Sequence, residues 1–115
     1  MATIAATRNE ALPNYHLVTW ETLTQTDTDG AGVRLMGNGD RTVQVLGTFD
    51  SATIAIQGSV DGSNWVTLQD LEGNALTFTA AGIKGILESP PFIRPLLSGG
   101  TTSDIDVLLS VGKAN

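Results

Sequence analysis

The chain has 115 residues, a length that suits one domain with a single hydrophobic core. Its six Lys and Arg against twelve Asp and Glu give a formal net charge of −6 at pH 7, which leaves no basic stripe for nucleic-acid phosphates and little attraction for anionic membranes. Cysteine is absent, so disulfides, thiolate metal sites and a cysteine nucleophile are excluded. We therefore expect neither nucleic acid nor a membrane as a partner.

The first fourteen residues are predicted to form a flexible N-terminal arm, followed by one domain over residues 15–115. Met1–Asn14 is rich in Ala, Thr and Asn and ends with a proline and an asparagine. A short helix over Ala2–Leu12 would be marginal alone, because the segment has no long apolar stripe to pack. We expect the arm to be ordered only where something holds it, and a frayed terminus is the alternative.

The domain is predicted to begin with a strand over Tyr15–Leu23, in which odd-numbered and even-numbered side chains lie on opposite faces. A polar loop follows over Thr24–Gly32, and then a short apolar run over Val33–Met36. The next four residues, Gly37–Asp40, are a strong turn signal.

The stretch Arg41–Phe78 is predicted to form a β-meander of four strands. Its turns are indicated by Asp50-Ser51, Asp61–Asn64 and Glu72–Asn74, because such residues tolerate positive φ or hydrogen-bond their own backbone. Apolar residues alternate with polar ones along the first two strands, so one row of each is expected to face the core. The inward row includes Val43, Val45, Ile54, Ile56 and Val60.

The C-terminal third is predicted to contain three strands. The first, Ile83–Glu88, is ended by Ser89-Pro90-Pro91, since proline cannot donate a ladder hydrogen bond. The second, Phe92–Leu97, contains Pro95, which we expect to confine it to an edge or a bulge. The third, Asp104–Val111, has the clearest alternation of the chain, with its odd-numbered apolar residues inward.

These elements predict an all-β fold. About eight strands at intervals of about ten residues, without a convincing helix, favour a single-domain antiparallel β-sandwich with jelly-roll-like topology. The residues predicted to form its core are Val43, Val45, Ile54, Ile56, Leu68, Phe78, Ile105, Val107 and Leu109.

Few residue patterns in the chain are typical of catalysis or metal binding. His16 is the only histidine, which excludes a histidine-pair metal site, and no nucleophile signature lies near it. The run Asp27–Gly30 is similar to part of a calcium loop, but Ala31 stands where a third oxygen ligand is needed and Asn38 where a glutamate is needed. We therefore expect no metal, no cofactor and no enzymatic activity.

The most distinctive short motif is Asp61–Trp65, DGSNW, which is predicted to be a hairpin loop whose tryptophan returns to the sheet. An exposed Trp65 or Trp20 would instead offer a stacking platform for a sugar ring. The interpretation that both tryptophans belong to the core is favoured, because each is flanked by strand residues.

Several runs resemble small structural proteins of tailed-phage virions: Gln44–Phe49, Ile56–Trp65, Leu76–Lys84 and Ile93–Pro95. The similarity extends from about Trp20 to Val111. These are turn and strand motifs without chemistry, so they indicate a fold better than an activity. The resemblance implies a virion component, in particular a decoration or cement protein on the outer surface of the capsid.

The resemblance also implies partners, namely the major capsid protein and further copies of the chain in a homotrimer. The arm, the tryptophans and one arginine of the resembling motifs are the candidate partner contacts: Ala2, Thr3, Ile4, Arg8, Trp20, Trp65 and Arg94. The alternative is a carbohydrate-binding or other accessory module of the phage tail or neck.

Overall fold

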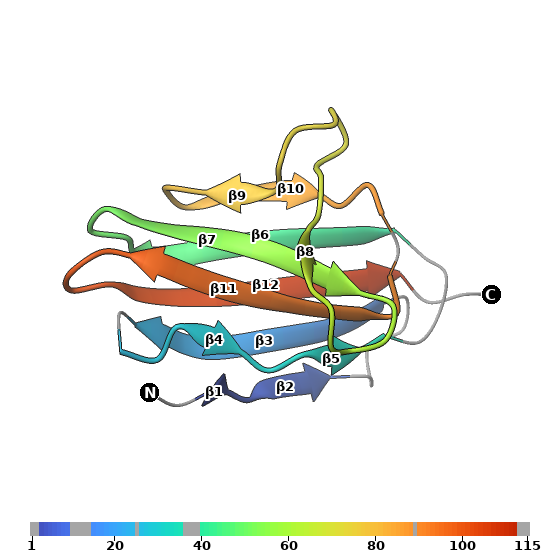
Figure 1. Ribbon diagram of the computed structural model, residues 1–115, viewed down its shortest axis with the longest axis horizontal. Helices are drawn as coiled ribbons and strands as arrows, with labels where there is room; N and C mark the ends of the chain where they lie inside the picture. The colour runs from blue at the N-terminus through green and yellow to red at the C-terminus, as the bar shows by residue number, and fades with distance from the viewer. Residues whose placement is uncertain (1–2, 10–14, 25, 36–39, 89, 113–115) are drawn as a thin grey trace.

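The computed structural model describes residues 3–9, 15–24, 26–35, 40–88 and 90–112. In these residues the protein is all-β without a helix, and its strands form two sheets packed face to face (Figure 1). The predicted all-β sandwich is confirmed. The strands are β1 (Thr3–Ile4), β2 (Ala6–Asn9), β3 (Tyr15–Thr24), β4 (Asp29–Gly30), β5 (Val33–Arg34), β6 (Arg41–Thr48), β7 (Ala52–Ser59), β8 (Val66–Thr67), β9 (Thr77–Phe78), β10 (Gly82–Gly85), β11 (Phe92–Gly99) and β12 (Asp104–Gly112).

The strand order of the two sheets determines which strands form the two edges of the sandwich. The first sheet has the order β1-β4-β11-β7-β8, with β5 beside β11 and β9 beside β7; the second has the order β10-β6-β12-β3-β2. In Figure 1, β7 and β11 lie in front of β6 and β12. One edge of the sandwich is therefore formed by β8, β9 and β10, and the opposite edge by β1 and β2.

The predicted meander over Arg41–Phe78 is wrong, because its first two strands belong to different sheets. β6 pairs with β10 and β12, whereas β7 pairs with β11, β8 and β9. The chain passes between the sheets at Asp50 and Ser51, which have φ values of 46° and 71°. Alternation identifies the inward face of a strand but not its neighbour, so a corner between sheets has the same pattern as a hairpin.

The predicted core is confirmed, since all nine residues named for it are buried. Trp20 and Leu23 join them although they lie three positions apart on β3. The register between β3 and β12 shifts between Ile105 and Val107, where β3 has one extra residue. This bulge turns Trp20 and Leu23 to the same inward face. Val60 was predicted inward but is exposed, because β7 ends at Ser59 and the chain leaves the sheet there.

β11 is an interior strand, which corrects the expectation that Pro95 would confine it to an edge or a bulge. On one side it pairs with β7 along its whole length; on the other it pairs with β5 at Phe92 and Ile93 and with β4 at Leu96. Pro95 lies where the chain passes from β4 to β5 and the ladder is interrupted. A Cβ atom at Gly30 would lie 2.4 Å from the Pro95 ring, so glycine leaves the room that the proline needs.

The N-terminal segment is not the separate arm that we predicted, because its described part adds a strand to each sheet. β1 pairs in parallel with β4, and β2 pairs antiparallel with β3. Ile4 and Ala6 pack against the core. The described part contains no helix, and the predicted boundary at residue 14 lies outside the described residues.

Candidate interaction surface

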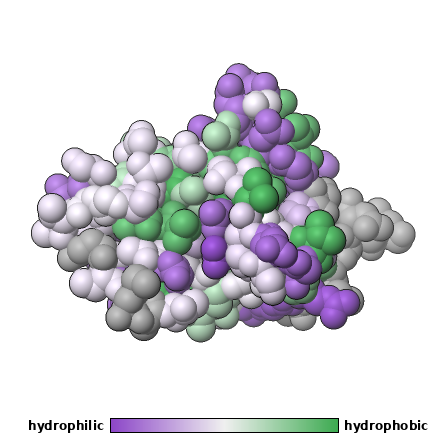
Figure 2. Space-filling view, in the orientation of Figure 1, coloured by the Kyte–Doolittle hydropathy of each residue, from purple (hydrophilic) through white to green (hydrophobic). Residues whose placement is uncertain are grey.

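Large hydrophobic side chains are exposed along the edge formed by β8, β9 and β10. Here the exposed fraction is 82% for Val60, 68% for Val66, 68% for Leu71, 64% for Ile83 and 50% for Leu87. In Figure 2, hydrophobic residues reach the surface over β8 and over the loop that follows β7. We call these five residues the apolar edge. Val60 and Val66 line the same groove, and exposed apolar side chains that lie together mark an interaction site more often than scattered ones do.

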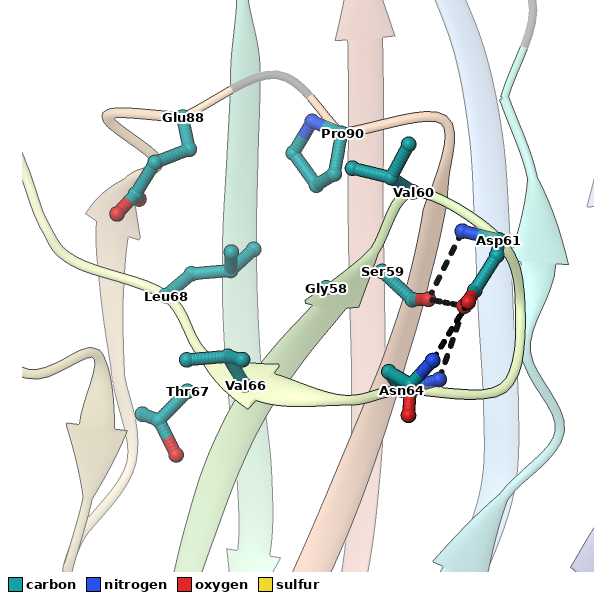
Figure 3. Close-up of a pocket in the computed structure, with 10 residues that line it drawn as sticks. All are labelled: Gly58, Ser59, Val60, Asp61, Asn64, Val66, Thr67, Leu68, Glu88 and Pro90. Atoms are coloured by element: carbon teal, nitrogen blue, oxygen red, sulfur yellow. Dashed lines mark hydrogen bonds between the residues drawn. The ribbon is translucent and has the colours of Figure 1, made fainter.

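A groove with a volume of about 490 Å³ lies within the apolar edge. It is lined by Gly58, Ser59, Val60, Asp61, Asn64, Val66, Thr67, Leu68, Glu88 and Pro90 (Figure 3). Gly58 forms part of its wall, because a Cβ atom there would lie 2.6 Å from Pro90 Cγ and 2.7 Å from Leu68 Cδ2. The buried guanidinium of Arg41 donates a hydrogen bond to the Pro90 carbonyl and so holds Pro90 in place against Gly58. Burial lowers the pKa of Arg41.

The loop beside the groove is held by the carboxylate of Asp61. It accepts hydrogen bonds from the backbone N–H group of Asn64 and from the Ser59 hydroxyl, both at 2.9 Å (Figure 3). It also accepts one from the backbone N–H group of Ser63 at 2.8 Å. These bonds, led by the one from the Asn64 backbone, hold the pKa of Asp61 well below its usual range. The predicted turn-forming role of Asp61 is therefore observed, and the loop is fixed without a partner.

Trp65 and Arg94, two of the predicted partner contacts, are brought together on the outer face of the first sheet. The Arg94 guanidinium carbon lies 4.4 Å from the centroid of the Trp65 ring, and Arg94 Nε donates to Gln57 Oε1 at 2.9 Å. The ring also covers Gly32, where a Cβ atom would lie 2.7 Å from it. Trp65 is thus half-buried rather than core, and its ring is stacked on Arg94 rather than presented as an open platform for a sugar.

Trp20 is not available as a partner contact, which corrects that prediction. Its side chain is 1% exposed, and its Nε1 donates to the Ala31 carbonyl at 2.8 Å. Trp20 is paired with Val107 and lies two positions from the buried Val18, so alternation along β3 directs its ring into the core. The interpretation of Trp20 as a core residue is confirmed.

The N-terminal candidates lie on the edge opposite to the groove. Thr3 is exposed and Ile4 half-buried on β1, while Arg8 is exposed on β2 and donates a hydrogen bond to the Arg34 carbonyl. Ala2 lies outside the described residues. The predicted contacts therefore do not form one surface: Thr3, Ile4 and Arg8 belong to one edge, and Trp65 and Arg94 to the outer face between the edges.

The side chains considered for metal binding are dispersed in the fold. His16 is half-buried on β3 opposite Val111, and Asp29 lies on β4 opposite Leu96. Within the described ranges, no group of three or more His, Asp or Glu side chains is placed to hold a metal ion. The same part of the chain contains no helix that is long and apolar enough to cross a membrane.

The apolar edge itself was missed from the sequence, although its residues carried a signal. Val60 directly precedes the Asp61–Asn64 turn, Val66 directly follows the same turn and Trp65, and Leu71 stands between Asp70 and Glu72. An apolar residue at a turn or in a very short strand has little sheet to cover it. That context, rather than hydrophobicity alone, would have indicated exposure.

Comparison of the chain with known proteins finds no matching family model, no matching curated protein and no matching solved structure.

Proposed function

We propose that the protein is a non-enzymatic structural component of a tailed-phage virion, which binds the outer surface of the assembled head and stabilises it. The observation that carries this proposal is the apolar edge, a group of exposed hydrophobic side chains on an otherwise well-packed domain. Burial of such side chains against a partner is favourable by about 25 cal/mol per Å² of apolar surface. The virion context comes from the resemblance of residues 20–111.

The strand order supports the finer prediction of jelly-roll-like connections. From β3 onward most connections pass from one sheet to the other, and the strand next to β3 is the last strand, β12. Jelly rolls are likewise double sheets of antiparallel strands, and among the described residues of this protein the short β1–β4 pair is the parallel exception. A rigid sandwich of this kind suits a protein that is repeated on a lattice.

A decoration protein stabilises a shell through mass action. A domain that binds only the assembled shell shifts the equilibrium toward assembly, in the same way that a ligand stabilises the state it binds. When one domain contacts two or more shell subunits, each added contact benefits from the effective concentration set by the first. The proposed homotrimer would multiply these contacts further, with a closed symmetry that is usual for repeated subunits.

The proposal is tested by the position and copy number of the protein in the virion. Heads and tails are separated, and the protein in each fraction is quantified by mass spectrometry against the major capsid protein. We expect the protein on heads, in a fixed stoichiometric ratio to the capsid subunit. Recovery only with tails or necks, in a few copies per particle, would show that the accessory-module alternative is correct.

A further inference from the structure

The groove opens where two neighbouring chain segments separate. Asp70 and Ile86 form an isolated antiparallel bridge, and the Leu87 N–H donates to the Gln69 carbonyl at 3.0 Å. The Gln69 N–H is then satisfied by the side chain of Glu88, at 2.8 Å, rather than by backbone. Beyond this point Pro90 and its neighbouring proline have no N–H with which to continue the ladder. The space between β8 and this segment is the groove.

The edge of β8 at the groove has backbone groups directed away from the sheet. The Leu68 N–H donates to the Ile56 carbonyl at 2.9 Å, so it faces β7. Backbone groups of successive residues in a strand point to opposite edges, which turns those of Thr67 away from β7. β8 is the last strand on this path of its sheet in the described residues. Thr67 therefore offers hydrogen bonds to an extended backbone beside an apolar groove.

The charges around the groove favour a partner segment of the opposite charge. Two of the lining residues, Asp61 and Glu88, are acidic, and none is basic. The whole chain, with these two residues included, has a net charge of −6. Complementary charge accelerates association and suppresses wrong partners, so a basic segment is favoured here over an acidic one or over a second copy of this acidic chain.

The size of the groove limits what enters it. Its volume of about 490 Å³ lies in the lower half of the range of about 300–1,000 Å³ typical of small-molecule pockets. Val60, Val66 and Leu68 present hydrocarbon to it, so an aliphatic or aromatic group fits its lining. Pro90 and Leu68 pack closely against Gly58, and Arg41 donates a hydrogen bond to the Pro90 carbonyl. The lining is therefore already ordered, and binding loses little conformational entropy of the protein.

We propose that the groove binds one apolar side chain of an extended segment of a partner protein, and that basic residues flank this side chain in the partner. The inference rests on the proposed function for the identity of the partner, a subunit of the shell, but its chemistry can be tested without any shell. The apolar side chain fills the groove, the backbone of the segment pairs with Thr67, and the flanking cations face Asp61 and Glu88.

The test uses short acetylated peptides in which one phenylalanine is flanked on both sides by lysine or, in the matched peptide, by glutamate. Each is titrated into the full-length protein and followed by amide chemical shifts. We expect the lysine peptide to shift Gly58, Val66 and Leu68, and the glutamate peptide to bind about tenfold more weakly. The variant Val66→Lys should lose binding of the lysine peptide. Leu71→Lys is the control, because Leu71 is equally exposed at 68% but does not line the groove.

Several outcomes would overturn the inference. These are an absence of shifts at the groove, equal affinity for the two peptides, and equal loss of binding in Val66→Lys and Leu71→Lys. Sedimentation velocity of both variants provides a further check: a homo-oligomer that Val66→Lys alone dissociates would show that a second copy occupies the groove.

Binding to purified heads separates this inference from the proposed function. If wild-type protein does not bind heads but the peptide preference holds, the groove is correct and the proposed function is wrong. If Val66→Lys and wild-type protein bind heads equally well, the proposed function stands and the groove does not contact the shell.

Discussion

β12 and the segment from Val60 to Leu71 are similar in sequence pattern and opposite in burial. In β12 the apolar residues at alternate positions from Ile105 to Val111, Leu109 among them, are 0% exposed. In the other segment, Val60 and Leu71 also stand between polar neighbours, yet these two residues and Val66 are 68–82% exposed. β12 lies between β6 and β3 and is covered by the first sheet. In contrast, β8 has only two residues and lies at the edge of its sheet, with β7 as its neighbour on one side. Alternation therefore predicts a face, and position in the sandwich decides whether that face is buried.

The largest expected difference between the two regions is in stability. We expect Leu109→Ala to lower the free energy of unfolding by about 2–5 kcal/mol, because it leaves a cavity between the sheets. Leu71→Ala should change it by less than about 0.5 kcal/mol, since a side chain that is mostly in water loses little on truncation. Urea unfolding of both variants measures this. Similar losses would mean that the apolar edge is part of the folding core.

Gly58 tests the boundary between core and groove. Gly58→Ala is expected to cost about 1–3 kcal/mol, because the new methyl group would overlap Pro90 and Leu68. Gly82→Ala is the matched control: a Cβ atom there would meet its nearest neighbours, on the Phe78 ring, at an ordinary 3.7 Å. If Gly58→Ala were as stable as Gly82→Ala, Pro90 and Leu68 would be able to move aside and make room for the methyl group.

The opposite edge is expected to respond more weakly. Ile4→Ala should lower the free energy of unfolding by about 0.5–1.5 kcal/mol, because Ile4 is only partly buried against the core. Thr3→Ala, at the neighbouring exposed position of β1, should be close to neutral. The same urea titration measures both variants. If Ile4→Ala left the free energy of unfolding unchanged, β1 would add nothing to the packing, as expected for an arm separate from the domain.

The smallest expected effect concerns pH and the corner between β6 and β7. The Thr101 hydroxyl, together with the hydroxyl and backbone N–H of Thr102, lowers the pKa of Asp50 from 3.8 to about 2. Because the folded pKa lies below the unfolded one, the stabilisation is present above pH 3.8 and is lost as the pH falls toward 2. The difference in melting temperature between wild type and Asp50→Asn should therefore shrink over this range. A difference that stays constant from pH 5 to pH 2 would contradict this role.

The sequence predicted the inward faces of the main strands well, because burial on both sheets follows a period of two residues. It also predicted Asp61 as a turn residue, since its carboxylate acts within a few positions of its own backbone. It failed where the outcome depends on distant partners. The corner at Asp50, the interior place of Pro95 and the strand formed by Ala6–Asn9 are all set by contacts with segments far along the chain.

The candidate site was predicted only in part for the same reason. Trp65 and Arg94 were singled out separately, and only the fold stacks them on each other. The groove was not predicted, because it forms where β8 and the segment around Pro90 separate. These segments are distant in the sequence, and no short residue pattern indicates that they diverge at this point. The bulge in β3 that turns Leu23 to the same face as Trp20 likewise depends on the register of β3 with β12.

A cryo-electron microscopy map of heads that carry the protein would show whether the apolar edge is the surface at which the protein binds its partner. Docking the sandwich into the map identifies the edge that faces the shell. We expect β8 and β10 to face the capsid subunits, with Val60 and Val66 covered by shell density. A map in which β1 and β2 face the shell while Val60 and Val66 remain in solvent would contradict this expectation.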